Sequence, residues 1–568
     1  MLLNSLHIAA KSLNASTLGI QVAGQNLANA GTTGYVREQL LTGTSYPKKT
    51  GSGLTLGTGV DVTGVTQMID TYLEERLRNS QSDAMNTATQ SGVYSQLEFI
   101  LNELTDKDLS TQLDDFFNAI SDVLNQPENL SVRQMAIDEG VKLASLITDM
   151  SGAVLKQRVD INRSIVDLND QINLLTSEIA KLNQSIAQIE AGRGPGVEAV
   201  GLRDQRLVAL SNLSSLINIK THEDESGVVT VSCGNDILIS SNGAKELVVG
   251  YINDPYGDLS LAEIRFKSDN SPLEARTGKL NGLYEGRDAI LGEFSKQLDN
   301  YAESLVNQFN AVYASGQGLT GYDTITSLAV VAETDMPLNL AGLMPLPVNG
   351  VFSIMVQNQQ TGISTTTKIS VPITSSEKDT LTLEGLVAKI NGIEGITARI
   401  TNGNQLEIVS DSPELRFAFA DDTSGILPAL GLNTFFTGSD SRSIGVSMAL
   451  RNDPGKLAMS QTGIGADTAN GVMLAALPEE RMAEYGNKSI TEAYRFTVTD
   501  VFSKAGVVKA VASGEASYYY SLQTQRDSIS GVNIDEETLL LMNYQRSYQA
   551  AAKYVSVINE MLDALIRM

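Results

Sequence analysis

Few residues of this sequence have side chains suited to catalysis or metal binding. The two histidines and the single cysteine, Cys233, leave little material for a metal site, and one cysteine cannot form a disulfide within the chain. The run from His222 to Glu225 offers ligands for a cation, but a polar run that opens a β segment is more often a solvated turn. His7 lies beside an apolar stripe and is expected to be an interface residue. We therefore predict no catalytic residue, no metal site and no cofactor, and we expect that the protein is not an enzyme.

A glycine-rich stretch, with Gly51, Gly53, Gly57 and Gly59, is loosely similar to a phosphate-binding loop. Such a loop requires a strand before it and a helix after it, and the sequence predicts neither at this place. The stretch is interpreted as a flexible connection.

The strongest periodic pattern links the two ends of the chain. Apolar residues recur there at alternating steps of three and four, which is the spacing of a coiled-coil seam. In the N-terminal stripe the intervening positions are the small residues Ala10, Thr17 and Gly24. We predict that the two ends form paired helices. The residues predicted to form an assembly interface between subunits are Leu3, Leu6, Leu13, Ile20, Leu27, Leu541, Tyr544, Tyr548, Ala551, Val555, Ile558, Leu562 and Leu565.

Start and stop signals support both terminal helices. The first is expected to end at Ala30, because Gly31 is a good left-handed cap. The second is expected to begin after Asn533, whose side chain can cap the helix while Glu536 reaches back to the cap residue. Ordering about 28 residues costs roughly 1–2 kcal/mol each, whereas each buried seam side chain returns about 1.5–3 kcal/mol. We therefore predict that both ends are mobile in the free monomer and become ordered when neighbouring subunits cover them.

The distribution of charge separates the ends of the chain from its middle. The 568 residues include 41 basic and 66 acidic ones, which gives a formal net charge of −25. Residues 1–36 carry only Lys11, and residues 538–568 are also nearly neutral. Neutral ends suit close packing between copies, and an acidic middle suits a solvated exterior that avoids nucleic acid and anionic membranes. No signal peptide or long apolar run is recognisable, so we expect a cytoplasmic protein or one that leaves the cell without a cleaved signal.

The middle of the chain alternates helical and strand-like stretches. Residues 36–66 are expected to form a hairpin or an extended linker. A long rod helix is predicted from Val132 to Ala191, with a possible interruption near Gly152 and a turn at 192–196, before a shorter helix folds back beside it. The predicted class is α+β multidomain, with terminal helices forming a coiled coil, a helical-bundle middle with long rod-like helices, and inserted mainly-β outer modules. The predicted domains are a terminal coiled-coil assembly domain (1–45 and 529–568), a helical middle domain (46–217, 283–315 and 466–528), a β insertion (218–282) and outer β-rich modules (316–465).

Several motifs carry a resemblance to a known family. The run from Asn26 to Ala30, followed by Thr33-Gly34-Tyr35 and Arg37, resembles the N-terminal signature of bacterial flagellar rod, hook and hook-associated proteins. The C-terminal signature of these proteins is matched by Tyr544-Gln545-Arg546, Tyr548-Gln549-Ala550-Ala551 and Asn559-Glu560-Met561. Within this family, the run from Ser528 to Glu537 is similar to that of the subunits at the hook-filament junction. The helical middle also fits, whereas the β modules match only loosely.

The resemblance implies a structural subunit of the flagellum that forms the junction between hook and filament. It implies export by the flagellar type III system, a cytoplasmic chaperone on the C-terminal helix, and polymerisation through the terminal helices. The implied partners are other copies in a helical layer or ring, the hook protein and the second hook-filament junction protein, with no nucleic acid and no membrane insertion. The implied location is extracellular, on the flagellum, after a cytoplasmic stage.

Three alternatives share some of these features. A flagellar hook or distal rod subunit would have the same terminal signatures, but the long rod helix and the run Asp535-Glu536-Glu537 favour the junction. A secreted coiled-coil effector or adhesin would lack matched signatures at both ends. An enzyme fused to an axial domain would need a catalytic set within 316–465, and we find none in the sequence.

Overall fold

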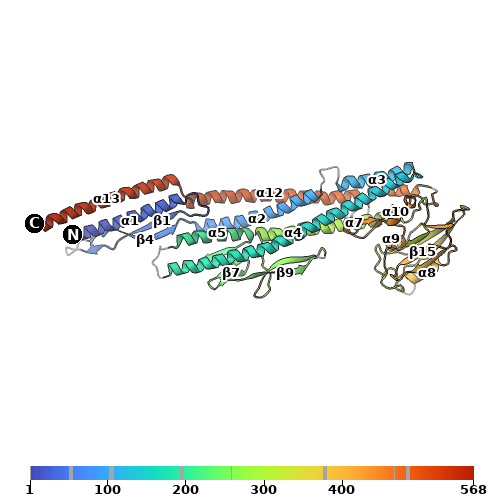
Figure 1. Ribbon diagram of the computed structural model, residues 1–568, viewed down its shortest axis with the longest axis horizontal. Helices are drawn as coiled ribbons and strands as arrows, with labels where there is room; N and C mark the ends of the chain where they lie inside the picture. Colours follow the sequence, from blue (N-terminus) through green and yellow to red (C-terminus); the bar gives the residue numbers. More distant parts are fainter. Residues whose placement is uncertain are drawn as a thin grey trace. The chain divides into compact units, whose positions relative to one another are not determined.

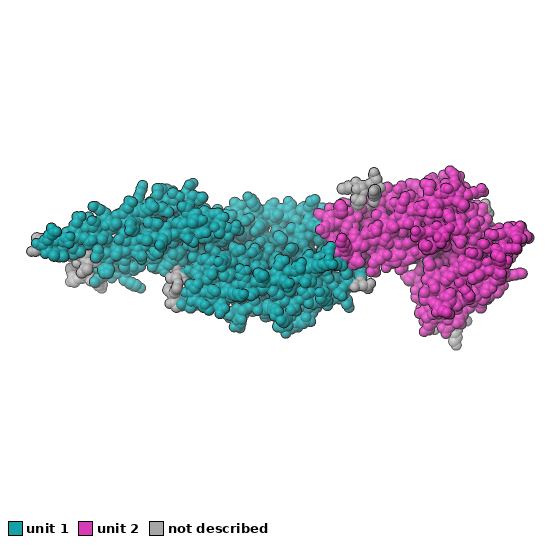
Figure 2. All heavy atoms as spheres, viewed as in Figure 1, with its two compact units in different colours: residues 1–93, 159–289, 505–568 teal, residues 94–158, 290–504 magenta. Residues whose placement is uncertain are grey.

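The computed structural model describes residues 2–49, 55–101, 108–191, 198–257, 259–374, 380–465, 467–481 and 487–567. The chain divides into two compact units, coloured separately in Figure 2. The first unit contains residues 1–93, 159–289 and 505–568, and the second contains residues 94–158 and 290–504. Four helical elements contribute residues to both units: α2 (Thr71–Leu101), α4 (Leu130–Glu190), α12 (Ile490–Ser530) and the π-helix η1 (Gly286–Gly292).

The remaining helices of the first unit are α1 (Leu2–Ala28), α5 (Val200–Leu216), α6 (Gly278–Glu285) and α13 (Ile534–Arg567). Helices α1 and α13 lie side by side, so the two ends of the chain pair as predicted (Figure 1). Helix α1 ends two residues before the predicted Ala30, because Asn29 and the residues after it turn back on the helix through bonds such as that from the Thr32 backbone N–H to the Asn29 carbonyl.

A β-hairpin follows α1 and packs along it. Strands β1 (Glu38–Thr44) and β4 (Val60–Gln67) pair antiparallel, with a bulge between Leu41 and Thr42, and β2 (Lys48–Lys49) pairs with β3 (Thr55–Leu56). Lys11 on α1 binds Asp61 on β4 at 2.7 Å and donates a hydrogen bond to Ser45. Of the two forms predicted for residues 36–66, the hairpin is the one observed. Gly51 and Gly53 lie outside the described residues.

Helix α4 is continuous over 61 residues, so the interruption considered near Gly152 is absent. One glycine weakens a helix by only about 1 kcal/mol, and buried neighbours such as Met150 and Val154 hold the segment in place. In the first unit, the apolar residues predicted to recur at steps of four and three form the buried face of α4. Its buried members are Ile161, Ile165, Leu168, Ile172, Ile179, Leu182 and Ile186. The turn predicted at 192–196 lies outside the described residues.

Residues 218–282 build two small sheets against α4. The first has the order β5 (Lys220–Glu223), β6 (Val229–Cys233), β7 (Asp236–Ser240) and β8 (Gly243–Ala244), and the second pairs β9 (Leu247–Asn253) with β10 (Ser260–Phe266). Three asparagines of α4 bind strand backbone through both side-chain atoms. Asn162 binds Ser260 and Ala262, Asn173 binds Leu247, and Asn183 binds Val229. Each amide satisfies one strand N–H and one carbonyl, which fixes the register of the strands on the helix.

The second unit has a large apolar core. Its helices are α3 (Leu109–Asn125), α7 (Glu293–Tyr313), α8 (Leu383–Ile390), α9 (Ile426–Leu430), α10 (Met448–Asn452), α11 (Ala469–Ala476) and the short 3₁₀ helix η3 (Pro454–Lys456). Its strands are β11 (Thr324–Thr326), β12 (Gly350–Asn358), β13 (Ser364–Val371), β14 (Ile396–Ile400), β15 (Leu406–Ser410), β16 (Leu415–Ala420), β17 (Phe436–Thr437) and β18 (Gly445–Val446).

These strands form sheets in the orders β13-β12-β16, β11-β15-β14 and β17-β18, and apolar side chains from the two larger sheets share one core with α8 and α9. The predicted α+β multidomain class, with paired terminal helices, long helices and inserted β modules, is confirmed. Within the described ranges, no helix combines the length and the hydrophobicity that a membrane span requires.

Candidate assembly site

The predicted apolar stripe of α13 faces α1. Ala551 and Ile558 are buried, whereas Leu541, Tyr544, Val555 and Leu562 are half-buried along the same side of the helix. The two remaining members, Tyr548 and Leu565, are exposed. Seven-residue spacing therefore identified the inner face of this helix, although that face is only partly covered within one chain.

Helix α1 turns a different face toward α13 from the one predicted. Leu6, Leu13 and Ile20 are only half-buried, Leu27 is 38% exposed, and Leu3 lies outside the residues whose side chains are described. The most buried side of α1 is a stripe of small and polar residues with the same four-three spacing, which we call the small-residue stripe. Its buried members are Ala9, Ser16, Gly19, Ala23 and Asn26, and the half-buried Ser5 and Ser12 continue it.

Gly19 explains why this stripe meets α13, and not the predicted stripe of Leu6, Leu13, Ile20 and Leu27, which we call the leucine stripe. A Cβ atom added at Gly19 would lie 2.5 Å from Cε1 of Tyr544, so the ring of Tyr544 occupies the space that a side chain would need. Small residues let two helix axes approach closely, with a large ring of one helix seated over the backbone of the other. The signal was present in the sequence as a second heptad pattern. A search for large apolar residues passes over it because serine, alanine, glycine and asparagine score as polar or neutral.

Asn26 is the polar centre of the pair and is 1% exposed. Its side-chain N–H₂ group donates to the Glu38 carbonyl at 2.9 Å and to Glu537 at 3.1 Å. Its side-chain oxygen accepts from the Tyr35 hydroxyl at 2.8 Å and from the Glu38 backbone N–H at 2.9 Å. All four hydrogen-bonding positions of the amide are thus used, which ties α1, the following turn, the hairpin and α13 together.

Arg37 binds residues at the start of α13 and just before it. Its side chain donates from Nε to Glu537 at 2.7 Å and from Nη1 to Glu536 at 3.0 Å, and its backbone N–H donates to the carbonyl of Ser530 at 2.9 Å. Asn533 caps the helix as predicted by accepting from the Asp535 backbone N–H at 3.0 Å. The prediction that Glu536 reaches back to the cap is wrong, because the carboxylate of Glu536 binds the guanidinium of Arg37 instead. A charged donor is a stronger partner for a carboxylate than a backbone amide.

The turn before Arg37 depends on a glycine. Gly34 has a φ of +80°, and a Cβ atom there would overlap Cγ2 of Val208 on α5. The next residues bring Val36 and Tyr35 against α5, where Asp204 accepts hydrogen bonds from the Val36 backbone N–H at 3.3 Å and from the Gln67 side chain at 2.6 Å. The predicted N-terminal signature is therefore the part of the chain that connects α1, α5 and α13.

Burial shifts the acid strength of the groups around this connection. Desolvation raises the pKa of Asp204 to about 6, against the opposing effect of its hydrogen bonds. Desolvation and the nearby Asp204 also raise the pKa of Glu38, and desolvation raises the pKa of Tyr35 well above its ordinary value. A neutral Tyr35 hydroxyl is the form that donates to Asn26.

Two acidic residues of the run from His222 to Glu225, which could have bound a cation, make ion pairs or hydrogen bonds with other residues of the chain. Glu223 pairs with Arg203 at 2.7 Å and with Arg206 at 3.2 Å, and the Asp224 carboxylate accepts from Ser226 and Val228. Within the described ranges no group of three or more histidine, cysteine or acidic residues is placed to hold a metal ion. The thiol of Cys233 is buried, and desolvation raises its pKa to about 12, so it is not a reactive nucleophile at neutral pH. His7 is exposed on α1.

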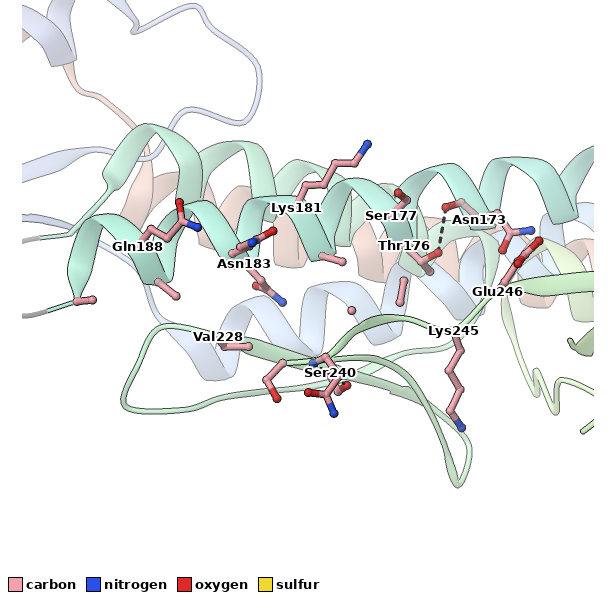
Figure 3. Close-up of a pocket in the computed structure, with 18 residues that line it drawn as sticks. Asn173, Thr176, Ser177, Lys181, Asn183, Gln188, Val228, Ser240, Lys245 and Glu246 are labelled. Carbon is pink, nitrogen blue, oxygen red and sulfur yellow. Dashed lines mark hydrogen bonds between the residues drawn. The ribbon is translucent and has the colours of Figure 1, made fainter. Parts of the chain in front are cut away.

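A groove of about 800 Å³ lies between α4 and the edge formed by β7 and β8 (Figure 3). Amide and hydroxyl groups line it, including Ser177, Asn183 and Ser240, with Lys181 and Lys245 also present. Asn183 is committed to the backbone of Val229, as described above. The lining thus contains neither a nucleophile with a neighbouring base nor a pair of carboxylates, and the groove has no catalytic arrangement.

Comparison with known families gives matches in the middle and at the C-terminal end of the chain. Residues 523–568 match the family described as flagellar basal body rod FlgEFG protein C-terminal, which covers the end of α12 and all of α13. The paired terminal helices thus include a segment that is similar to the C-terminal part of flagellar rod proteins. Residues 94–326 match the family described as flagellar hook-associated protein FlgK helical domain. Over this segment the chain is similar to flagellar hook-associated proteins.

Relatives extend the similarity over the full length. The chain is 25% identical to flagellar hook-associated protein 1 of Escherichia coli (strain K12) over 99% of its own length and 98% of that protein. It is 24% identical to flagellar hook-associated protein 1 of Bacillus subtilis (strain 168), over 99% of its own length and 97% of that protein. A solved structure, that of the flagellar hook junction protein FlgK from Burkholderia pseudomallei, is 17% identical and gives a TM-score of 0.49, covering 80% of this chain and all of that one.

Proposed function

We propose that this chain forms the junction between the flagellar hook and the filament, and that it assembles through α1 and α13. The observation that supports the proposal is the incomplete burial of this helix pair. Tyr548 and Leu565 of the predicted stripe are exposed, Leu6 and Leu13 are half-buried, and α13 carries further exposed apolar residues. A helix pair with apolar residues on its outer faces is stabilised when other helices cover it.

The proposed partners are those that the resemblance to flagellar hook-associated proteins implies. Copies of this chain would cover the terminal helices in a helical layer or ring, with the hook protein on one side and the second hook-filament junction protein on the other. The polar connection at Asn26 and Arg37 would hold α13 at a fixed angle to the rest of the first unit, so that every copy presents the same surface. A shared angle is needed because a repeated head-to-tail contact closes into a ring or helix only when each step is identical.

The acidic middle of the chain would lie outside this layer. Residues 1–36 and 538–568 are nearly neutral, so the excess of acidic residues belongs to the segments between them. We propose that the β-rich modules at 218–282 and 316–465 form the outer surface of the junction. Their charge would keep that surface solvated.

Export is proposed to precede assembly. The subunit would pass through the flagellar type III system in an unfolded or partly folded state, would be cytoplasmic before export, and would be extracellular afterwards. A chaperone would cover α13 in the cytoplasm, because exposed side chains such as Met561 and Ile566 would otherwise favour premature association. The role is structural, and we propose that the protein is not an enzyme.

Deleting the gene in its host tests the proposal. We expect hooks without filaments, flagellin released into the medium and loss of swimming, all restored by the intact chain. Absent hooks would instead support the alternative role as a hook or distal rod subunit. Normal swimming filaments would contradict both roles and would favour a secreted coiled-coil effector or adhesin. Electron microscopy of the deletion strain, together with an immunoblot of the medium for flagellin, separates these results.

A further inference from the structure

Helix α13 has a second apolar stripe that no part of the described chain covers. We call it the outer stripe, and its members follow steps of four and three residues. They are Ala550, Tyr554, Val557, Met561 and Ala564. Tyr554 is 44% and Met561 is 52% exposed. The stripe has the period of a coiled-coil seam, but the seam facing α1 already uses Ala551, Val555 and Ile558.

Helix α1 also has a partly open stripe, which is the predicted leucine stripe and whose Leu6, Leu13 and Ile20 are half-buried. Large residues at positions 6, 13, 20 and 27 alternate with Ala10, Thr17 and Gly24. Ala10 and Thr17 are exposed, and a Cβ atom added at Gly24 would meet nothing within 4 Å. The small positions therefore form open recesses between the large ones along this face.

We propose that the outer stripe of α13 docks on the leucine stripe of α1 in a second copy of this chain. This inference rests on the proposed function and specifies which faces meet. The two stripes are complementary in size, because Tyr554 and Met561 are large where the leucine stripe offers Gly24 and Thr17. Large side chains of one helix entering recesses of another are the knobs-into-holes contacts of a coiled coil.

Charge decides between this pairing and a contact between two α13 helices. Beside the outer stripe lie Lys553 and Glu560. If copies point in the same direction within a layer, two α13 helices in register would place Lys553 beside Lys553 and Glu560 beside Glu560, which is unfavourable. The only charged residue of α1 is Lys11, which is bound to Asp61 of the hairpin. Helix α1 can therefore accept α13 without repulsion between like charges.

The contact is heterologous, because it joins two different surfaces. Each copy would present one outer stripe and one leucine stripe, so each can contact two neighbours in a continuous series. Such a contact generates a ring or a helical layer, whereas a symmetric α13–α13 contact would stop at a dimer.

Photocrosslinking in assembled flagella tests the proposal. A benzophenone amino acid is placed at position 557 of the full chain, and flagella isolated from the complemented deletion strain are irradiated. We expect a product of dimer size in which α13 is joined to the tryptic peptide 12–37, which contains Leu13, Ile20 and Gly24. The same probe at the exposed polar position Gln549 is the control and should give no such product.

Substitutions provide a second readout. Gly24→Leu fills a recess that is empty in the monomer and adds helix propensity, so the free chain should unfold at a temperature no lower than that of the wild type, while filaments per hook fall by about tenfold or more. Adducts that join α13 to α13, or α13 to a different protein, in flagella that contain the chain would overturn this inference alone, as would normal filament numbers with Gly24→Leu. Absence of the wild-type chain from flagella would overturn the proposed function and the inference together.

Discussion

The terminal helix pair and the aromatic core of the second unit differ in the size of the side chains that pack inside them and in how completely one chain buries its apolar residues. In the second unit Phe116, Phe309 and Phe435 are fully buried, with ring centroids of Phe309 and Phe435 5.1 Å apart. In the terminal pair α1 contributes small residues and one polar centre to the inner contact, while large residues of α13 such as Tyr554 and Met561 stay exposed. The first arrangement is complete within one chain. The second leaves apolar surface for other chains, so stability and assembly depend on different parts of the molecule.

The largest expected effect comes from the aromatic core. Phe309→Ala removes a ring that packs on Phe116, Phe435 and Phe436, and should lower the free energy of unfolding by about 3–5 kcal/mol. Urea denaturation followed by circular dichroism measures the loss. Phe496→Ala is the matched control, because Phe496 is exposed, and its effect should stay under about 0.5 kcal/mol. Equal losses in the two variants would contradict the description of this core.

The next effect concerns the attachment of α13. Glu537→Ala leaves the buried Asn26 amide and Arg37 without their shared acceptor, and should cost about 2–3 kcal/mol locally, since Arg37 keeps Glu536. Amide hydrogen exchange along α13 should accelerate by about thirtyfold or more. Glu536→Ala, at an exposed carboxylate, should change exchange only slightly. If both variants exchanged alike, Glu537 would not be the residue that fastens the helix.

The third prediction concerns Asp204 on α5, whose contribution to the free energy of unfolding should depend on pH. The pKa of Asp204 is raised to about 6 in the folded chain, so the native state binds more protons than the unfolded state between about pH 4 and 6. Stability contributed by this group is therefore present at low pH and is lost, by about 2–3 kcal/mol, as pH rises through 6. Asp204→Asn keeps an oxygen that can accept from Val36 and Gln67, and should be more stable than the wild type at pH 8.

Urea denaturation at about pH 4.5 and about pH 8 measures this difference. The difference between the two proteins should narrow at the lower pH, where Asp204 is largely protonated in the folded chain and most of the stability lost at about pH 8 is regained. A constant difference at both pH values would show that the substitution acts through packing rather than through the buried charge.

The smallest effect distinguishes two glycines of α1. Gly19→Ala places a Cβ atom against the Tyr544 ring and should destabilise the α1–α13 pair by about 1–2 kcal/mol. Gly24→Ala meets open space and should stabilise the helix by up to about 1 kcal/mol, because alanine has the higher helix propensity. Hydrogen exchange of α1 and α13 compares them. Opposite signs would support the assignment of Gly19 to the inner face, and equal signs would contradict it.

Periodicity in the sequence determined the helices and one of the two faces that meet. The alternation from Leu541 to Leu562 identified the side of α13 that faces α1, and the alternation from Ile161 to Ile186 identified the buried side of α4. These predictions succeed because burial along a straight helix repeats with the helical period, whatever the partner is. The signatures at both ends also predicted the similarity to flagellar hook-associated proteins that the comparisons found.

Tertiary structure alone decided which face of α1 is inner and which acidic residue fastens α13. Helix α1 has two stripes with the same period, and only the position of Tyr544 over Gly19 selects the small-residue stripe. Local sequence favoured Glu536 as a partner of its own helix cap, but Arg37, 499 residues away in the chain, binds it instead. Periodicity and capping rules describe one element at a time. The choice between competing faces and partners depends on the shape and charge of the element that packs against them.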